Sequence, residues 1–186
     1  MSNARDQILQ TTCSLLEKQG FHGTGLNEIV RESGAPKGSL YYYFPDGKDQ
    51  ITAEAVLQSG QVTAERIQNG LAESSNASKA VYDFILKIAD NVELSGFAAG
   101  SPLTTVAMET ATKSERINLA CREAYGALQA AFRDKLLESG YTKTKAEELS
   151  TFITASIEGG IILSRTYHTA DPLRLVAKQL KAVLAL

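Results

Sequence analysis

Apolar side chains recur at spacings of three and four residues along almost the whole chain, which is the period of an amphipathic α-helix. No segment shows the strict alternation of apolar and polar residues, bounded by turn residues, that is typical of a strand. The sequence therefore predicts an all-α fold. Nine helices are expected, at residues 3–19, 26–33, 36–43, 48–71, 78–92, 102–111, 114–139, 144–166 and 171–186.

Composition narrows the class of protein further. The chain has 186 residues, of which 44% are hydrophobic, and its formal net charge is −2, so it is an ordinary globular sequence. The two cysteines, Cys13 and Cys121, are far apart and form no CxxC pair, which argues against a disulfide framework and against a zinc site.

The longest uncharged stretch, residues 94–108, is too short and too interrupted by glycine and proline to span a membrane. The first residues lack the apolar segment of a secretion signal, and we expect a cytoplasmic protein that inserts into no membrane.

The most informative stretch is residues 24–48, TGLNEIVRESGAPKGSLYYYFPDGK. Two short helices flank a turn that contains Gly34, which is the pattern of a helix-turn-helix. Pro36 fits the first turn of the second helix, because its ring removes an N–H that is unpaired there anyway. Apolar residues of the two helices are expected to form a small core with the first helix; they are Leu26, Ile29, Val30, Leu40 and Phe44, against Ile8, Leu15 and Leu16.

The outward face of the second short helix is polar and has small residues, which suits the major groove of DNA. Lys37 and Ser39 can reach base edges, and Gly38 lets the backbone approach closely. Tyrosine hydroxyls can bond phosphates, and Lys48 can hold a phosphate beside the N–H groups of the next helix. The predicted DNA-binding residues are Thr24, Gly25, Pro36, Lys37, Gly38, Ser39, Tyr41, Tyr42 and Lys48.

The charge of this region does not by itself favour DNA. Residues 1–50 contain five basic and six acidic side chains, which gives a formal charge of −1. Lys37 and Lys48, however, lie on the expected recognition side, and helix N-termini add partial positive charge there. We therefore expect modest affinity for random DNA and a shallow salt dependence, because the salt dependence follows the number of phosphates neutralised.

The residues Gly38-Ser-Leu-Tyr-Tyr-Tyr-Phe44, followed by Lys48, resemble the signature of the TetR/AcrR family of bacterial transcriptional repressors. The turn from Phe44 to Lys48 is one residue longer than usual, and together with residues 100–111 and 157–165 it resembles the LmrA/YxaF-like branch. The resemblance implies a nine-helix TetR-like subunit with a three-helix DNA-binding domain at 1–47 and a ligand-binding and dimerisation domain at 48–186. It further implies a homodimer that binds double-stranded operator DNA, is released by a small hydrophobic effector and uses no cofactor.

A pair of glycines, Gly159 and Gly160, interrupts a long apolar helix at a cost of about 2 kcal/mol in helix propensity. Close approach of a neighbouring helix would offset that cost, and the apolar residues around the pair fall on one stripe. The stripe favours a four-helix dimer interface, although the core of a single chain would show the same spacing. The predicted interface residues are Ile153, Ile157, Gly160, Ile161, Ser164, Val176 and Leu180.

A second set of residues lies on segments that, by the resemblance, line the effector pocket in relatives. They are Phe84, Ile88, Asn91, Phe97, Thr105, Met108, Tyr125 and Phe152. Apolar walls with a few hydroxyls and amides suit a hydrophobic, planar ligand, and the resemblance alone suggests compounds of the flavonoid type. For each aromatic side chain, ordinary core packing is the alternative. Residues 96–102, with two glycines and a proline, predict a flexible lip at the pocket entrance.

No catalytic or metal-binding constellation is apparent, since His22 and His168 fall in expected loops and the carboxylates lie near Lys or Arg on polar faces. Cys121 suits either a thiol sensor or a small buried hydrophobe. The sequence therefore favours a ligand-responsive repressor that is not an enzyme. An activator of the same family, and a helical carrier or enzyme with a vestigial helix-turn-helix, are the alternatives.

Overall fold

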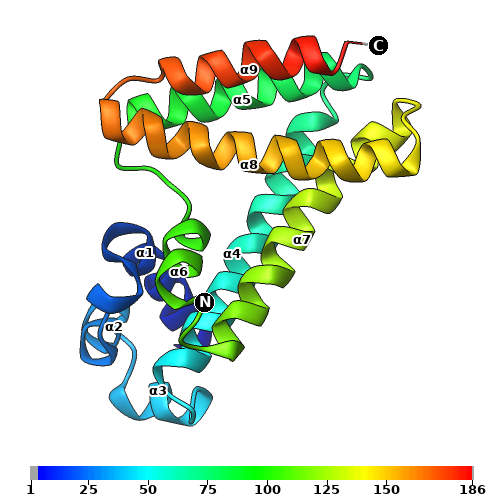
Figure 1. Cartoon of the computed structure of the whole chain (residues 1–186). Helices are drawn as coiled ribbons and strands as arrows, with labels where there is room; N and C mark the ends of the chain where they lie inside the picture. Colours follow the sequence, from blue (N-terminus) through cyan, green and yellow to red (C-terminus); the bar gives the residue numbers. More distant parts are fainter. Residues whose placement is uncertain (1–3, 186) are drawn as a thin grey trace. The chain divides into compact units, whose positions relative to one another are not determined.

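The computed structural model describes residues 4–185, which form nine α-helices and no strand (Figure 1). The all-α prediction is confirmed, and the predicted helices coincide with the observed ones to within a few residues. Asn3 and Leu186, which the sequence places in the first and last helices, lie outside the described residues. The helices are α1 (Ala4–Gly23), α2 (Leu26–Ser33), α3 (Lys37–Tyr43), α4 (Lys48–Leu71), α5 (Ala77–Leu94), α6 (Pro102–Thr110), α7 (Glu115–Glu138), α8 (Lys143–Tyr167) and α9 (Asp171–Val183).

Local sequence signals explain where several helices begin and end. The side chain of Asn76 accepts the backbone N–H of Lys79 at 2.8 Å and thereby caps α5 at its start. At the other end of α5, Gly96 has a positive φ of 63°, and the two N–H groups of Gly96 and Phe97 bond back to carbonyls of the last turn. Gly34 ends α2 in the same left-handed conformation.

Gly20 marks a kink in α1 rather than its end. The sequence predicts that the helix stops before this residue, but one further turn continues to Gly23. The backbone at Gly20 has φ 70° and ψ −175°, a conformation that side chains rarely permit. A Cβ at this position would also collide with the carboxylate of Glu109 on α6. The glycine therefore permits both the kink and the close approach of the Glu109 carboxylate.

The chain packs into two compact units. Among the described residues, the first comprises 4–61 and Ser101–Tyr125, and in it α1 packs against α2, α3 and α6. The second comprises Val62–Gly100 and 126–185, and in it α5, α8 and α9 lie side by side (Figure 1). These units describe packing, whereas the functional domains at 1–47 and 48–186 stay a prediction.

The glycine stripe of α8 packs against α9 within one subunit, so most of the residues predicted for the dimer interface are buried in the single chain. A Cβ on Gly160 would lie 2.9 Å from Leu173 and 3.4 Å from Val176, both on α9. Ile153, Ile157, Gly160, Ser164 and Leu180 are buried in the single chain, and Ile161 and Val176 are half-buried. The buried members of the stripe therefore fit the intramolecular core, the alternative that periodicity alone left open, and the dimer interface stays a prediction.

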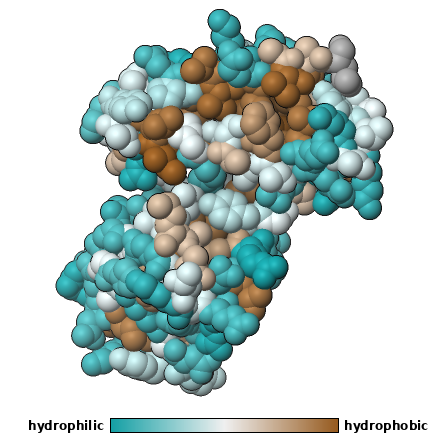
Figure 2. Space-filling view, in the orientation of Figure 1, coloured by the Kyte–Doolittle hydropathy of each residue, from teal (hydrophilic) through white to brown (hydrophobic). Residues whose placement is uncertain are grey.

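Large hydrophobic side chains nevertheless remain exposed on the two last helices, where Figure 2 shows hydrophobic surface. They are Phe152, Ile162, Leu163 and Tyr167 on α8, and Leu175 and Val183 on α9. Among residues 4–185, no helix is long and apolar enough to cross a membrane.

Candidate DNA-binding site

The site is built from α2, a short turn and α3. Leu40 and Phe44 are fully buried and fix α3, while Ile29 fixes α2 in the same core. In the turn, the Ser33 hydroxyl donates to the carbonyl of Val30 at 3.2 Å and accepts the N–H of Ala35 at 3.3 Å. Because both helices are anchored from the inside, the core fixes which of their side chains face outward.

The outward face of α3 carries most of the predicted DNA-binding residues. Lys37, Gly38 and Tyr41 are exposed, and the side chain of Tyr42 is 79% accessible to solvent. Nothing lies within 4 Å of the position that a Cβ on Gly38 would occupy. Pro36 is also exposed and precedes the helix as its N-cap residue, and Ser39 is half-buried. The geometry therefore presents a small polar surface with an open stretch of backbone at its centre.

Lys48 begins α4 and is held by an aromatic ring of α1. Its ammonium nitrogen lies 4.2 Å from the centroid of the Phe21 ring, within the range of a cation–π contact. Partial burial lowers the pKa of Lys48, while the nearby carboxylates of Asp49 and Glu109 act in the opposite direction. The sequence indicates the lysine but not the ring on which it rests.

The structure contradicts the prediction that Thr24 contacts DNA. Its side chain is only 1% exposed, and its hydroxyl donates to the carbonyl of Gly20 at 2.7 Å. Thr24 therefore stabilises the end of α1 and offers no free hydroxyl to DNA. Gly25 is exposed and is the N-cap of α2, which leaves the start of that helix without a side-chain cap.

A contact between α6 and the end of α1 was not foreseen from the sequence. The carboxylate of Glu109 accepts the backbone N–H of His22 at 2.9 Å. The ammonium of Lys113 lies 3.1 Å from Nε2 of the same histidine. These residues are separated by about 90 positions, so no local pattern signals their contact. Glu109 therefore ties α6 to the three-helix DNA-binding region, and Lys113, just after α6, adds a second contact.

The eight predicted effector residues fall in both packing units, and their assignment to one pocket stays a prediction. Thr105, Met108 and Tyr125 belong to the first unit; Phe84, Ile88, Asn91, Phe97 and Phe152 belong to the second.

The surroundings of the effector residues differ. Phe84 is half-buried and packs edge-to-face on Phe132, with ring centroids 6.1 Å apart. Phe97 packs in the same way on His168, at 5.5 Å. Phe152 is 50% exposed on α8, in helical register with Leu163 and Tyr167, a position that suits a contact with another molecule better than a pocket wall.

The two cysteines are poor sensors. Burial raises the pKa of the Cys121 thiol to about 11, and that of the Cys13 thiol also to about 11. A reactive cysteine needs a populated thiolate, which these surroundings suppress. The structure thus favours the packing role for Cys121. Among the described residues, no group of three or more His, Cys, Asp or Glu side chains is placed to hold a metal ion.

An anchored helix-turn-helix with an exposed polar second helix defines a DNA-binding protein of the helix-turn-helix class. Residues 8–55 match the family described as bacterial regulatory proteins, tetR family, and residues 77–179 match the transcriptional regulator LmrA/YxaF-like C-terminal domain. The chain belongs to the TetR family of DNA-binding transcriptional regulators and has the LmrA/YxaF-like C-terminal domain.

Individual proteins agree with this assignment. The HTH-type transcriptional regulator YxaF of Bacillus subtilis strain 168 is 41% identical, over 98% of this chain and 95% of its own length. LmrA of the same organism is 37% identical, over 92% and 91%. The solved structure of a cysteine mutant of the TetR family regulator CifR, in complex with a 26-base-pair double-strand operator DNA, shares the fold with a TM-score of 0.79. The two chains are 20% identical, and the match covers 95% of this chain and 94% of the CifR chain.

Proposed function

We propose that the protein is a ligand-responsive repressor, in which each subunit of a homodimer inserts α3 into the major groove of double-stranded operator DNA. The observation that carries the proposal is the surface of α3: Lys37, Gly38 and Tyr42 are exposed on a helix that Leu40 anchors from within. Residues 1–47 serve as the DNA-binding domain, and residues 48–186 bind the effector and the second subunit. Similarity to YxaF and LmrA over nearly the whole chain supports this division of roles.

Selection from a randomised duplex library tests DNA reading directly. The purified wild-type chain is expected to enrich a palindromic sequence whose half-sites are centred about 10 base pairs apart, or a multiple of that spacing. Lys37→Ala is expected to weaken binding to this selected duplex more than binding to a random duplex of the same length, because base-edge contacts carry specificity. Failure to enrich any sequence would contradict the proposal.

The proposed dimer uses the exposed hydrophobic face of α8 and α9. A second copy would cover exposed side chains such as Leu163 and Leu175, whose apolar surface is typical of a subunit interface. Two-fold symmetry of the protein then matches two-fold symmetry of the operator.

Repression is tested in cells with a reporter whose promoter overlaps the selected site: its expression is expected to rise when the regulator is removed. A fall in expression would identify an activator.

The effector is proposed to be a small hydrophobic aromatic molecule. The half-buried Phe84 and Ile88 of α5 support a site of this chemistry. A tenfold loss of operator affinity corresponds to a coupling of about 1.4 kcal/mol, and linkage requires that operator DNA weaken effector binding by the same factor. Calorimetric titration of a flavonoid, with and without the selected duplex, measures this coupling. An affinity that does not change with DNA would exclude the compound as the inducer.

A further inference from the structure

The turn that follows the recognition helix is held by side chains from α4. This turn runs from Phe44 to Lys48. The side-chain oxygen of Gln50 accepts the backbone N–H of Asp46 at 3.1 Å, and its amide nitrogen donates to the carbonyl of Tyr43, the last residue of α3, at 3.4 Å. The same amide nitrogen donates to Glu54 at 2.9 Å. Gln50 therefore connects the end of α3 to the turn and to α4.

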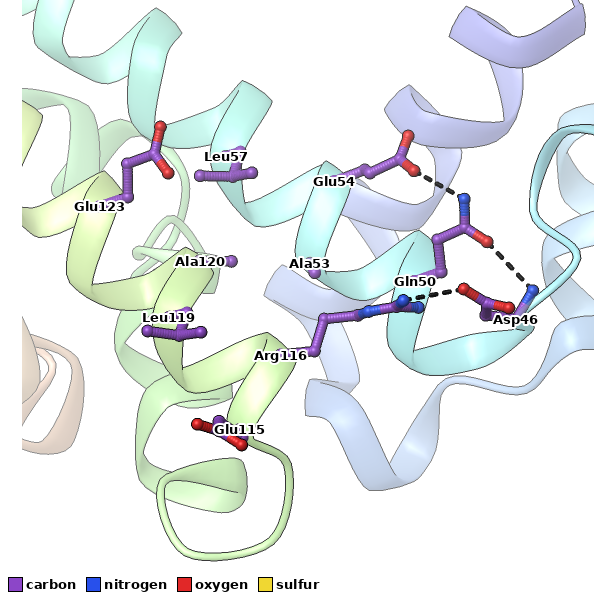
Figure 3. Close-up of a pocket in the computed structure, with 10 residues that line it drawn as sticks. All are labelled: Asp46, Gln50, Ala53, Glu54, Leu57, Glu115, Arg116, Leu119, Ala120 and Glu123. Atoms are coloured by element: carbon purple, nitrogen blue, oxygen red, sulfur yellow. Dashed lines mark hydrogen bonds and ion pairs between the residues drawn. The ribbon is translucent and has the colours of Figure 1, made fainter.

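The start of α7 and the residue before it contact this turn and the first turn of α4. Arg116 forms an ion pair with the carboxylate of Asp46 at 2.8 Å, as Figure 3 shows beside the hollow between α4 and α7. The hydroxyl of Ser114, the residue before α7, donates to the carboxylate of Asp49 at 2.6 Å. We call these two interactions the α7 contacts. They join residues 65 and 70 positions apart, and both lie within the first packing unit.

We propose that the α7 contacts are a positioning device for DNA recognition: Arg116 fixes the turn after α3, Ser114 fixes the first turn of α4, and together they set the angle at which α3 meets the groove. The inference rests on the proposed role of α3 in reading DNA. Asp46 and Arg116 act through α3 and do not touch the bases. A short helix such as α3, of seven residues, has little rigidity of its own beyond its anchors, so its C-terminal turn needs an external support.

The sign of one substitution separates this role from simple electrostatics. Asp46→Asn removes a negative charge close to the DNA-binding surface while keeping the shape of the side chain. Since phosphates repel carboxylates, electrostatics alone predicts tighter DNA binding. Loss of the contact to Arg116 predicts weaker binding to the selected duplex. Both side chains are about half exposed, so the expected loss is about threefold to fivefold, the upper end of what an exposed ion pair is worth.

The experiment measures affinity of the full-length chain for the duplex selected by the wild type and for a random duplex of equal length. Glu32→Gln is the matched control, because it removes a carboxylate of α2 that pairs with its neighbour Arg31 and not with the turn. Asp46→Asn is expected to weaken binding to the selected duplex, and Glu32→Gln is expected to leave it unchanged or slightly tighter. Melting temperatures of both variants should stay close to that of the wild type.

A double variant and an exchange measurement complete the test. If Asp46 and Arg116 act as one unit, Asp46→Asn combined with Arg116→Gln binds the selected duplex no more weakly than the weaker single variant. Amide hydrogen exchange of residues 44–48 in the free protein is expected to become faster in Asp46→Asn and to stay unchanged in Glu32→Gln.

Three results would overturn the proposal: undiminished binding by Asp46→Asn, additive losses in the double variant, or unchanged exchange in the turn. Each of them leaves DNA binding by the wild type intact and so refutes the positioning role alone. Failure of the wild type to select any duplex would instead refute the proposed function on which the inference rests.

Discussion

Gly38 lies in the first turn of α3, and the space around its missing side chain is open. A glycine in a helix is less favourable than alanine by about 1 kcal/mol, so an exposed glycine at this position has no advantage for folding. Its presence is explained if the backbone of α3 approaches the DNA at this residue. We therefore propose that Gly38 serves DNA binding rather than the fold, and the two roles can be separated by substitution.

Gly38→Ala is expected to raise the free energy of unfolding by about 0.5–1 kcal/mol and to weaken binding to the selected duplex, because the added methyl group occupies space needed by DNA. Gly126→Ala in α7 is the matched control, since Gly126 is also helical with open space around it. It should bring a similar gain in stability, measured by urea denaturation, with no change in DNA affinity. Full DNA affinity in Gly38→Ala would show that the backbone does not come close to the groove.

The cysteines give a pH dependence with a defined sign. Burial raises the pKa of Cys121 from 9.0 to about 11, so its neutral thiol is favoured in the folded state. This preference contributes stability that is present in full below pH 9 and is lost as the pH rises through 11. At pH 8 the native thiol should react with iodoacetamide about 100-fold more slowly than the unfolded one, as measured by mass spectrometry. Rapid alkylation of Cys121 in the native protein would restore the sensor hypothesis.

At the scale of the helix, adjacent glycines of α8 have different surroundings. Gly160 faces Leu173 and Val176 of α9, whereas nothing lies within 4 Å of the Cβ position of Gly159. The cost of the glycine pair is therefore offset at Gly160 by close packing of two helices of one subunit. A bulky side chain there should separate α8 from α9 and lower the stability of the subunit itself.

Gly160→Leu is expected to lower the free energy of unfolding by about 1–3 kcal/mol, the usual cost of overpacking. Gly159→Leu should leave it unchanged or raise it, because leucine is the better helix former and the space is open. Thermal melts at a fixed protein concentration, with sedimentation to monitor assembly, make the comparison. Equal losses in the two variants would contradict the packing described for α8 and α9.

Several helices show which features of the fold and of the candidate site the sequence could predict. Helix number, the turn at Gly34 and the exposed face of α3 follow from local signals, because glycine, proline and apolar periodicity act within a few residues. The glycine stripe could not be assigned, because contact with α9 and contact with a second chain require the same spacing. Thr24 was misassigned because its hydroxyl bonds to Gly20. The contacts of Glu109 with His22 and of Arg116 with Asp46 join distant segments and leave no local trace.

At the scale of the whole molecule, the proposed recognition of an operator needs two copies of α3. The recognition helices of a dimer enter successive major grooves when they lie about 34–36 Å apart, one turn of DNA. A single subunit can reach only one half-site, and it loses the effective concentration that links the two binding events. The hydrophobic side chains left exposed on α8 and α9 are the surface on which that second copy is proposed to pack.

Leu163→Glu places a charge on this face and is expected to give folded monomers, because the native side chain is already 44% exposed and contributes little to the subunit core. Its affinity for the selected duplex should fall by about 100-fold or more through loss of the second half-site, while affinity for random DNA falls much less. Leu94→Glu, at an 87% exposed position at the end of α5, adds the same charge and should leave both the dimer and its DNA affinity intact. Analytical ultracentrifugation and DNA titration at matched salt compare the two variants. A Leu163→Glu protein that remains dimeric and binds the selected duplex like the wild type would place the subunit interface elsewhere.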